Sequence, residues 1–288
     1  MDDAFEILNW QLEAGVDLAI DDAPVNRFEQ VQNTKPQQKP LESPPEGPQV
    51  TNGSSLADRI AGQAGKSQPT PPPPARIISD AVMPDEAAVK SARDLAAAAG
   101  SLAELKQVLL EFQGCNLRRN AKNLVFGDGN PVADIMFVGE TPERDEDLQG
   151  MPFIGRSGQL LDLMLAAIGM DRSSVYISNV IPWRPPGNRT PTPAETEVCL
   201  PFIERHIELV APKILVMLGP LSAKTLLRTD DGILRLRGKW KQITFASHSV
   251  DAISSLHPTF LLRQPGQKRL AWQDFLKIKA KFDEANTG

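Results

Sequence analysis

The chain has 288 residues, 41% hydrophobic and 6% aromatic, a composition typical of a globular protein with one good-sized domain and additional segments. Residues 1–95 hold only 8 of the 31 Lys and Arg but 15 of the 36 Asp and Glu, so the formal net charge of −5 arises in this N-terminal third. No apolar run approaches the roughly 18 residues of a membrane span, and the acidic start lacks the features of a secretory signal. We therefore expect a cytoplasmic protein with no membrane partner.

The N-terminal third is predicted to contain a tethered helix. Hydrophobic side chains recur at near-helical spacing in residues 1–20, which predicts a short amphipathic helix. Such a helix either packs on the main domain or docks on a protein partner, and the sequence favours neither. Residues 36–74 hold 10 of the 25 prolines. They cannot bury enough apolar surface to offset their ordering entropy, so residues 21–85 are predicted to be a disordered linker.

From residue 86 to residue 288 the chain alternates between helical and strand patterns. The first segment, residues 86–112, is rich in Ala and Leu and is predicted to be helical, and a last helix is expected over residues 267–284. Thr192, followed by Pro193, is predicted to cap another helix. Between these segments lie four apolar runs of strand length: Ile135–Gly139, Val175–Ile181, Ile214–Leu218 and Ala252–Leu256. This order predicts an α/β domain, a three-layer αβα sandwich around a central, mostly parallel four-stranded sheet.

In such sheets ligands bind at the carboxyl ends of the strands, and the first strand ends in a dense group of acids. Five acidic residues fall within Gly139–Asp147, where Gly139 and Pro142 predict a tight turn. The segment Gly150–Gly158 follows, with an aromatic residue, Phe153, between two glycine-bearing turns and just before a helix. An aromatic ring here can stack on a planar ligand, and the helix start offers free N–H groups to a phosphate.

Two more strand ends carry polar side chains. The second strand ends at Asn179, whose carboxamide can offer both a donor and an acceptor to the edge of a base. It leads into a proline-stiffened loop with Arg184 and Arg189, which suit contacts to phosphates. The fourth strand ends at His257, a candidate catalytic residue. His206 and His248 are interpreted as structural or surface residues.

Taken in order, these segments resemble the family 4 uracil-DNA glycosylases. The family pattern combines a GE-x-PG acidic motif, G-x-PF-x-GR-x-G, an N-V-x-x-x-RPP-x-NR segment and a late HP-[ST]. The corresponding segments here are Gly139–Asp147, Gly150–Gly158, Asn179–Arg189 and His257–Thr259. The resemblance covers about residues 100–285. It implies a monomeric DNA repair enzyme that flips uracil out of DNA and hydrolyses its N-glycosidic bond, with uracil-containing DNA as partner.

The resemblance also implies roles for individual residues. The backbone at Gly139, Glu140 and Thr141 would bind uracil O2, and Phe153 would stack on the flipped base. Asn179 would read the base edge, and His257 would donate a hydrogen bond to O2. The candidate acids are Glu140 and Glu146, which would stabilise the sugar cation and position water, in an order that the resemblance leaves open. The candidate contacts to DNA phosphates are Ser157, Gly158, Arg184, Arg189 and Arg263.

The chain departs from this family in its cysteines. Family members carry a four-iron–four-sulfur cluster held by four cysteines, and this chain has two. Cys115 and Cys199 match the second and fourth positions, whereas Phe112 and Trp183 stand at the first and third. Neither side chain ligates iron, so we expect no cluster, no other cofactor and no metal. We expect the two aromatic side chains to fill the vacated volume.

A second departure is Glu143, which stands where the GE-x-PG motif has its second glycine. This carboxylate brings negative charge toward the DNA and keeps two alternatives open. One is a glycosylase for another deaminated base, hypoxanthine or xanthine. The other is a catalytically weak DNA-binding module. A nucleotide-binding α/β domain is disfavoured because neither GxGxxG nor a P-loop follows any strand.

Overall fold

The computed structural model describes residues 86–246 and 248–287. The helix expected over residues 1–20 and the linker expected over residues 21–85 lie outside the described residues. In the described part of the chain, no helix is long and apolar enough to cross a membrane.

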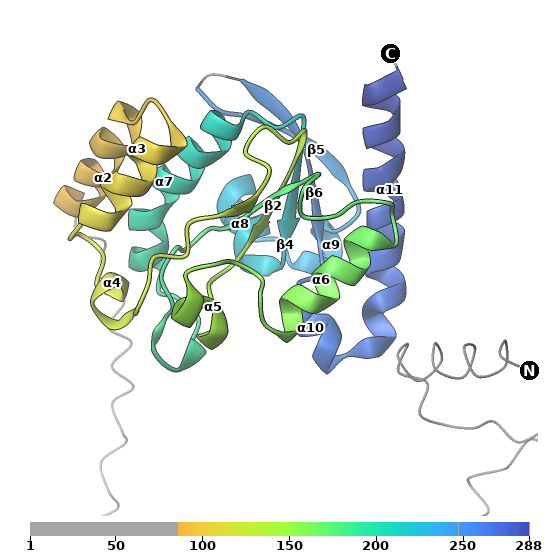
Figure 1. Cartoon of the computed structure of the whole chain (residues 1–288), viewed down its shortest axis with the longest axis horizontal. Helices are drawn as coiled ribbons and strands as arrows, with labels where there is room; N and C mark the ends of the chain where they lie inside the picture. Colours follow the sequence, from red (N-terminus) through yellow and green to blue (C-terminus); the bar gives the residue numbers. More distant parts are fainter. Residues whose placement is uncertain (1–85, 247, 288) are drawn as a thin grey trace, which may run out of the picture. The chain divides into compact units, whose positions relative to one another are not determined.

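A six-stranded sheet runs through the middle of the domain, in the order β1-β3-β2-β4-β6-β5 (Figure 1). Its four central strands are parallel: β2 (Ile135–Gly139), β3 (Tyr176–Asn179), β4 (Ile214–Leu218) and β6 (Ser249–Ser255). Two edge strands run antiparallel to their neighbours: β1 (Asp128–Gly129) beside β3, and β5 (Trp240–Thr244) beside β6.

The prediction of a four-stranded sheet is therefore right for the centre and wrong for the edges, because the whole sheet is mixed and has six strands. The two edge strands lack the apolar run that identifies a buried strand. β1 consists of two residues, Asp128 and Gly129. β5 has Trp240 and Ile243 among polar residues, and most of its side chains are exposed.

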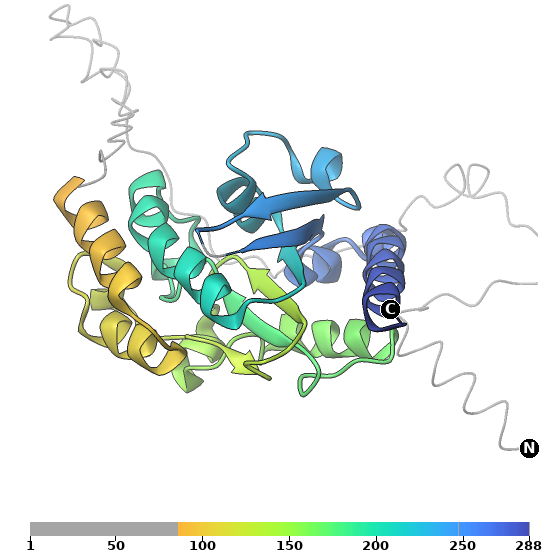
Figure 2. The same ribbon diagram turned by 90° about the horizontal axis from the view of Figure 1, so that it is seen from above.

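Helices cover both faces of the sheet, as predicted (Figure 2). Side chains alternate along a strand, so β2 contributes Met136 and Val138 to one core and Ile135 and Phe137 to the other. The first core is covered by α2 (Glu86–Ala98), α3 (Leu102–Glu111), α7 (Pro193–Val210) and α8 (Pro220–Leu227). The second is covered by α6 (Arg156–Ala166) and α11 (Lys268–Thr287). The remaining elements are short: α4 (Leu117–Asn120), α5 (Arg144–Gln149), α9 (Ile233–Leu236), α10 (Pro258–Arg263), η3 (Pro186–Asn188) and η4 (Pro265–Gln267).

Capping side chains set where two of the long helices begin. The single helix expected over residues 86–112 is two helices, because Ser101 accepts a hydrogen bond from the N–H of Glu104 (3.2 Å) and starts α3 anew. The predicted cap of α7 is confirmed. Thr192 Oγ1 accepts from the N–H of Glu195 (3.2 Å), and the carboxylate of Glu195 accepts from the N–H of Thr192 (2.7 Å), which is a complete capping box.

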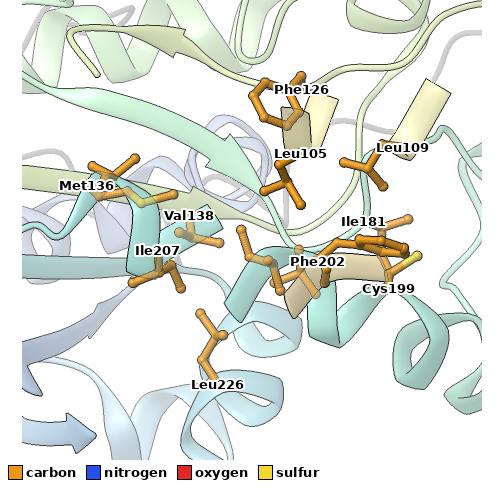
Figure 3. Close-up of a cluster of buried hydrophobic side chains, with 14 of the residues drawn as sticks. Leu105, Leu109, Phe126, Met136, Val138, Ile181, Cys199, Phe202, Ile207 and Leu226 are labelled. Atoms are coloured by element: carbon orange, nitrogen blue, oxygen red, sulfur yellow. The ribbon is translucent and has the colours of Figure 1, made fainter. Parts of the chain in front are cut away.

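The first core contains the two cysteines. Figure 3 shows Cys199 of α7 among buried apolar side chains from α3, α7, α8 and the sheet. Cys115 is buried in the same cluster, as are Phe112 and Trp183. The two aromatic residues therefore belong to the same core as the cysteines, and that they fill the vacated volume stays a prediction.

Candidate active site at the carboxyl ends of the parallel strands

The polar residues singled out in the sequence lie at one edge of the sheet, where the parallel strands end. Gly139 ends β2, Asn179 ends β3, and His257 follows β6 by two residues. Gly139 and Asn179 are direct partners in the register of β2 and β3. Glu140 continues from β2 into the same edge. The strand ends therefore bring these four candidates together, as the rule for ligand sites in parallel sheets predicts.

Gly139 allows the side chains of Asn179 and Phe153 to approach each other. A Cβ atom on Gly139 would lie 2.3 Å from Asn179 Oδ1 and 2.6 Å from Phe153 Cζ. Both distances are far below van der Waals contact, so any larger residue would displace the amide or the ring. The absence of a side chain at Gly139 thus leaves room for the Phe153 ring and the Asn179 amide to approach each other.

Phe153 lies in a left-handed backbone conformation, with φ of 54°, that a large side chain rarely adopts. Two neighbours hold it there. A Cβ atom on Gly158 would lie 1.6 Å from the carbonyl oxygen of Phe153, so only glycine permits this approach. The guanidinium of Arg172 donates to the carbonyl oxygens of Pro152 (3.2 Å) and Phe153. The ring is therefore presented by a loop that is held from both sides.

Sequence reasoning missed Arg172, which anchors this loop. Its guanidinium is itself positioned by ion pairs with Asp128 (2.7 Å) and Asp162 (2.8 Å). Arg172 precedes β3 and lies 19 residues from Phe153. A single arginine ahead of a strand gives no sequence signal for such a role, since the contact depends on how the loop folds back.

The amide of Asn179 is the least satisfied polar group at this edge. The side chain is 3% exposed, and within the described residues neither Nδ2 nor Oδ1 has a hydrogen-bond partner. Leaving a buried donor or acceptor unpaired costs about 1–3 kcal/mol. An amide kept in this state beside an aromatic ring is suited to a planar ligand that supplies one acceptor and one donor in return.

His257 is a neutral hydrogen-bond donor at this edge. It caps α10, and its Nδ1 accepts a hydrogen bond from the N–H of Thr259 (3.2 Å). The proton of the neutral ring is therefore on Nε2. Burial, followed by the positive charge of Arg263, lowers the pKa of His257 to about 4. The ring centroids of His257 and Phe153 are 5.4 Å apart, so the two rings are neighbours.

Glu140 is held by the start of α8. Its Oε1 accepts a hydrogen bond from the N–H of Leu221 (2.7 Å), one of the free donors at the N-terminus of this helix. Gly219 makes room, since a Cβ atom there would lie 2.5 Å from Glu140 Oε1 and 3.1 Å from the Cβ of His257. Burial raises the pKa of Glu140, and the Leu221 N–H and Arg263 oppose the rise.

Gly219 and the N–H of Leu221 were also missed by sequence reasoning. The available signal was Gly219-Pro220 directly after a buried strand, a pattern that marks the N-terminus of a helix at a strand end. A backbone donor carries no residue type, so only its position can reveal it.

Glu146 is the second buried acid at this edge and is 3% exposed. It lies in α5, and its Oε2 accepts a hydrogen bond from the N–H of Glu143 (2.9 Å). Burial raises the pKa of Glu146 to about 7, and the charge of Glu143 adds to the rise. The N–H groups of Glu143 and Phe153, and then Arg172, act in the opposite direction. Near neutral pH this carboxyl therefore exchanges between its protonated and ionised forms.

The residues expected to contact phosphates differ in how available they are. Ser157 and Gly158 are buried in the first turn of α6. Arg189 forms a two-point ion pair with Glu195 (2.6 and 2.8 Å), and Arg184 donates to Asn188 (2.6 Å) within its own loop. Arg263 is exposed at the end of α10. Its charge affects the pKa values of both Glu140 and His257, so it is the arginine next to the candidate site. Thr141 is half-buried beside Glu140.

The residues around the two cysteines do not fit a four-iron cluster. The Sγ atoms of Cys115 and Cys199 are 3.9 Å apart, and the Phe112 ring packs against Phe202 with centroids 4.9 Å apart. In residues 86–246 and 248–287, no three His, Cys, Asp or Glu side chains come close enough to hold a metal ion. Four thiolates are needed for such a cluster, and this core supplies two.

Comparison with known proteins shows the family to which the chain belongs. Residues 126–276 match the uracil DNA glycosylase superfamily. A type-4 uracil-DNA glycosylase of Archaeoglobus fulgidus is 40% identical over 182 residues, which are 62% of this chain and 92% of that protein. Enzymes with the same name from Sulfurisphaera tokodaii and Thermotoga maritima are 36% and 40% identical, over 62% and 58% of this chain and 84% and 86% of their own lengths.

Proposed function

Because the chain belongs to the uracil-DNA glycosylase superfamily, we propose that it removes uracil from DNA by hydrolysing the bond between uracil N1 and the sugar C1′. The observation that carries this proposal is the amide of Asn179, which is buried beside the ring of Phe153 and has no hydrogen-bond partner among residues 86–246 and 248–287. The product is an abasic site and free uracil. The relatives from Archaeoglobus fulgidus, Sulfurisphaera tokodaii and Thermotoga maritima are named as type-4 uracil-DNA glycosylases, which supports the choice of base.

Asn179 can select uracil by hydrogen bonding. Its Nδ2 would donate to uracil O4, and its Oδ1 would accept from uracil N3–H. Cytosine presents an amino group and a bare N3 at the same two positions, so both bonds would become repulsive contacts. A site built to hydrogen-bond a ligand rejects the analogue that leaves its buried groups unpaired. The face of Phe153 would hold the base after it has left the DNA stack.

The donor and acceptor groups at the site are suited to the charges that develop in the reaction. As the bond to C1′ breaks, negative charge develops on uracil O2 and positive charge on the sugar. Neutral His257 would donate its Nε2–H to O2, which stabilises the departing anion without a formal proton transfer. Its pKa of about 4 keeps it neutral throughout the physiological range.

We assign Glu140 to the sugar side of the reaction. The carboxylate of Glu140 and the Cβ of His257 both lie against Gly219, so the two residues are neighbours. An ionised carboxylate here would stabilise the sugar cation and orient the water that adds to C1′. Glu146 is bonded to backbone N–H groups of the neighbouring loop, and we assign it to holding that loop.

We also propose that this chain works without an iron–sulfur cluster. The close thiol pair Cys115 and Cys199, within an aromatic and aliphatic core, supports this proposal. Iron and inorganic sulfide measured in anaerobically purified protein are expected to be absent. Stoichiometric iron with the matching visible absorbance would contradict the proposal.

The test of the function is base release from a single-stranded oligonucleotide with one uracil, followed by alkaline cleavage of abasic sites. We expect cleavage by the wild type and a loss on the order of 100-fold or more in Asn179→Ala, because two specific hydrogen bonds are removed. Asn120→Ala, at an exposed position of α4, is the matched control and is expected to behave as wild type. An inactive wild type would refute uracil excision. Hypoxanthine and xanthine substrates would then test the other deaminated bases, and inactivity on all three would leave a DNA-binding role.

A further inference from the structure

Glu143 is linked to Glu146, the acid that holds the loop after β2, and to the candidate catalytic residue His257 through hydrogen bonds that no sequence pattern suggested. Its Oε1 accepts a hydrogen bond from Thr259 Oγ1 (2.9 Å), although the two residues are 116 positions apart. The backbone N–H of Glu143 donates to Glu146 Oε2 (2.9 Å), and the backbone N–H of Thr259 donates to His257 Nδ1 (3.2 Å). Each partner in the side-chain bond thus holds one candidate residue through its backbone.

We propose that the Glu143–Thr259 hydrogen bond is a brace that positions Glu146 and His257 relative to each other, so that Glu143 is a positioning residue for the reaction. The proposal rests on the proposed uracil excision. The brace joins the N-terminus of α5 to the N-terminus of α10, and these two helices have six residues each. Helices this short are not stable by themselves, so their orientation depends on contacts from outside.

The identity of residue 143 matters because the motif that this chain resembles has glycine there. A glycine has no side chain to reach Thr259, whereas a carboxylate accepts a strong hydrogen bond from a hydroxyl group. Glu143 in place of the glycine of the motif therefore has a structural role. It fastens the acidic loop after β2 to the segment that carries His257.

The same contact would hold the ring of His257 in one orientation. The Nδ1 bond from Thr259 fixes the ring, and Thr259 is fixed in turn by Glu143. A misplacement of a catalytic group by about 1 Å can cost on the order of 100-fold in rate. Loss of the brace should therefore lower kcat more than it changes KM, because the base-reading contacts of Asn179 remain.

Four variants separate the hydrogen bond from charge and from size. Glu143→Gln keeps an oxygen acceptor, and Thr259→Ser keeps the hydroxyl donor. Glu143→Gly and Thr259→Val each remove one partner, and valine preserves the shape of threonine and its backbone N–H. With a uracil oligonucleotide, we expect the first two to retain kcat. The last two should lose on the order of 10- to 100-fold, and their combination should lose no more than either alone.

A second measurement does not depend on excision. The ring nitrogens of the three histidines can be followed by ¹⁵N NMR, with His257→Gln to assign the signals. We expect Glu143→Gly and Thr259→Val to shift the Nδ1 signal of His257, and Glu143→Gln to leave it unchanged. Wild-type kcat and spectra in Glu143→Gly, or losses that multiply in the double variant, would overturn the brace. An inactive wild type with the expected NMR shifts would refute the function and keep the brace.

Discussion

Replacing Glu146 by glutamine is expected to stabilise the protein at pH 8 but not near pH 4. The side chain is 3% exposed, and burial raises its pKa to about 7 from the ordinary glutamate value of 4.5. Between these two pH values the native state keeps a proton that the unfolded chain releases. The contribution of protonated Glu146 to the free energy of unfolding is therefore fully present below pH 4.5 and is lost as the pH rises through 7. At about 1.4 kcal/mol per pH unit, the loss reaches about 3 kcal/mol.

Glutamine removes this ionisation and keeps an acceptor for the N–H of Glu143. The free energy of unfolding, measured by chemical denaturation at several pH values, should therefore differ little between variant and wild type near pH 4. The difference should grow to about 3 kcal/mol in favour of the variant at pH 8. Asn120→Ala, at an exposed position of α4, removes no ionisable group and is the control that should show no such trend. A difference between Glu146→Gln and wild type that stays constant with pH would refute the reasoning.

Three further predictions concern the geometry of the site. Gly139→Ala should reduce excision on the order of 100-fold or more in the oligonucleotide assay, because its Cβ would collide with Asn179 and Phe153. The control is Gly232→Ala, whose Cβ would meet no described atom within 4 Å, and it should leave excision intact. His257→Gln should lower kcat on the order of 100-fold by weakening the donor to uracil O2. Because the pKa of His257 is about 4, protonation of this residue should not lower the activity of the wild type above about pH 5. Arg172→Lys keeps the charge but cannot contact both carbonyl groups of the Phe153 loop, so we expect a loss on the order of 10-fold in kcat/KM with a wild-type pH profile.

The centre of the fold could be predicted because its strands are buried on both faces. β2 and β4 are continuous apolar runs, and the predicted ranges Ile135–Gly139 and Ile214–Leu218 are confirmed to the residue. Edge strands have one open side and tolerate polar residues, so β5 resembles a loop in sequence. The break between α2 and α3 escaped detection for a different reason. α2 ends at Ala98 and Ser101 caps α3, so the interruption is only three residues long within a segment whose apolar spacing is helical on both sides.

The candidate site could be predicted from the sequence only where it uses side chains with recognisable functional groups. Asn179, Phe153, Glu140 and His257 follow strands or turns and carry recognisable groups, and the structure brings them to one edge. The parts that escaped are backbone donors, such as the N–H of Leu221, and contacts between distant segments. The hydrogen bond between Glu143 and Thr259 belongs to this second class, because neither residue indicates its partner.

The contacts around Asn179 and Phe153 explain how the protein maintains two unfavourable features of the candidate site. An unpaired amide at Asn179 and a left-handed Phe153 each cost on the order of 1–3 kcal/mol. Such strain persists only where the surroundings leave no alternative. Gly158 and Arg172 restrict the loop of Phe153, and register pairing with Gly139 restricts Asn179. A bound uracil would recover the cost of the unpaired amide by hydrogen bonding to it, whereas the backbone strain at Phe153 would remain. The amide would in this way contribute to affinity for the extruded base, which an enzyme needs when its substrate must first leave the DNA stack.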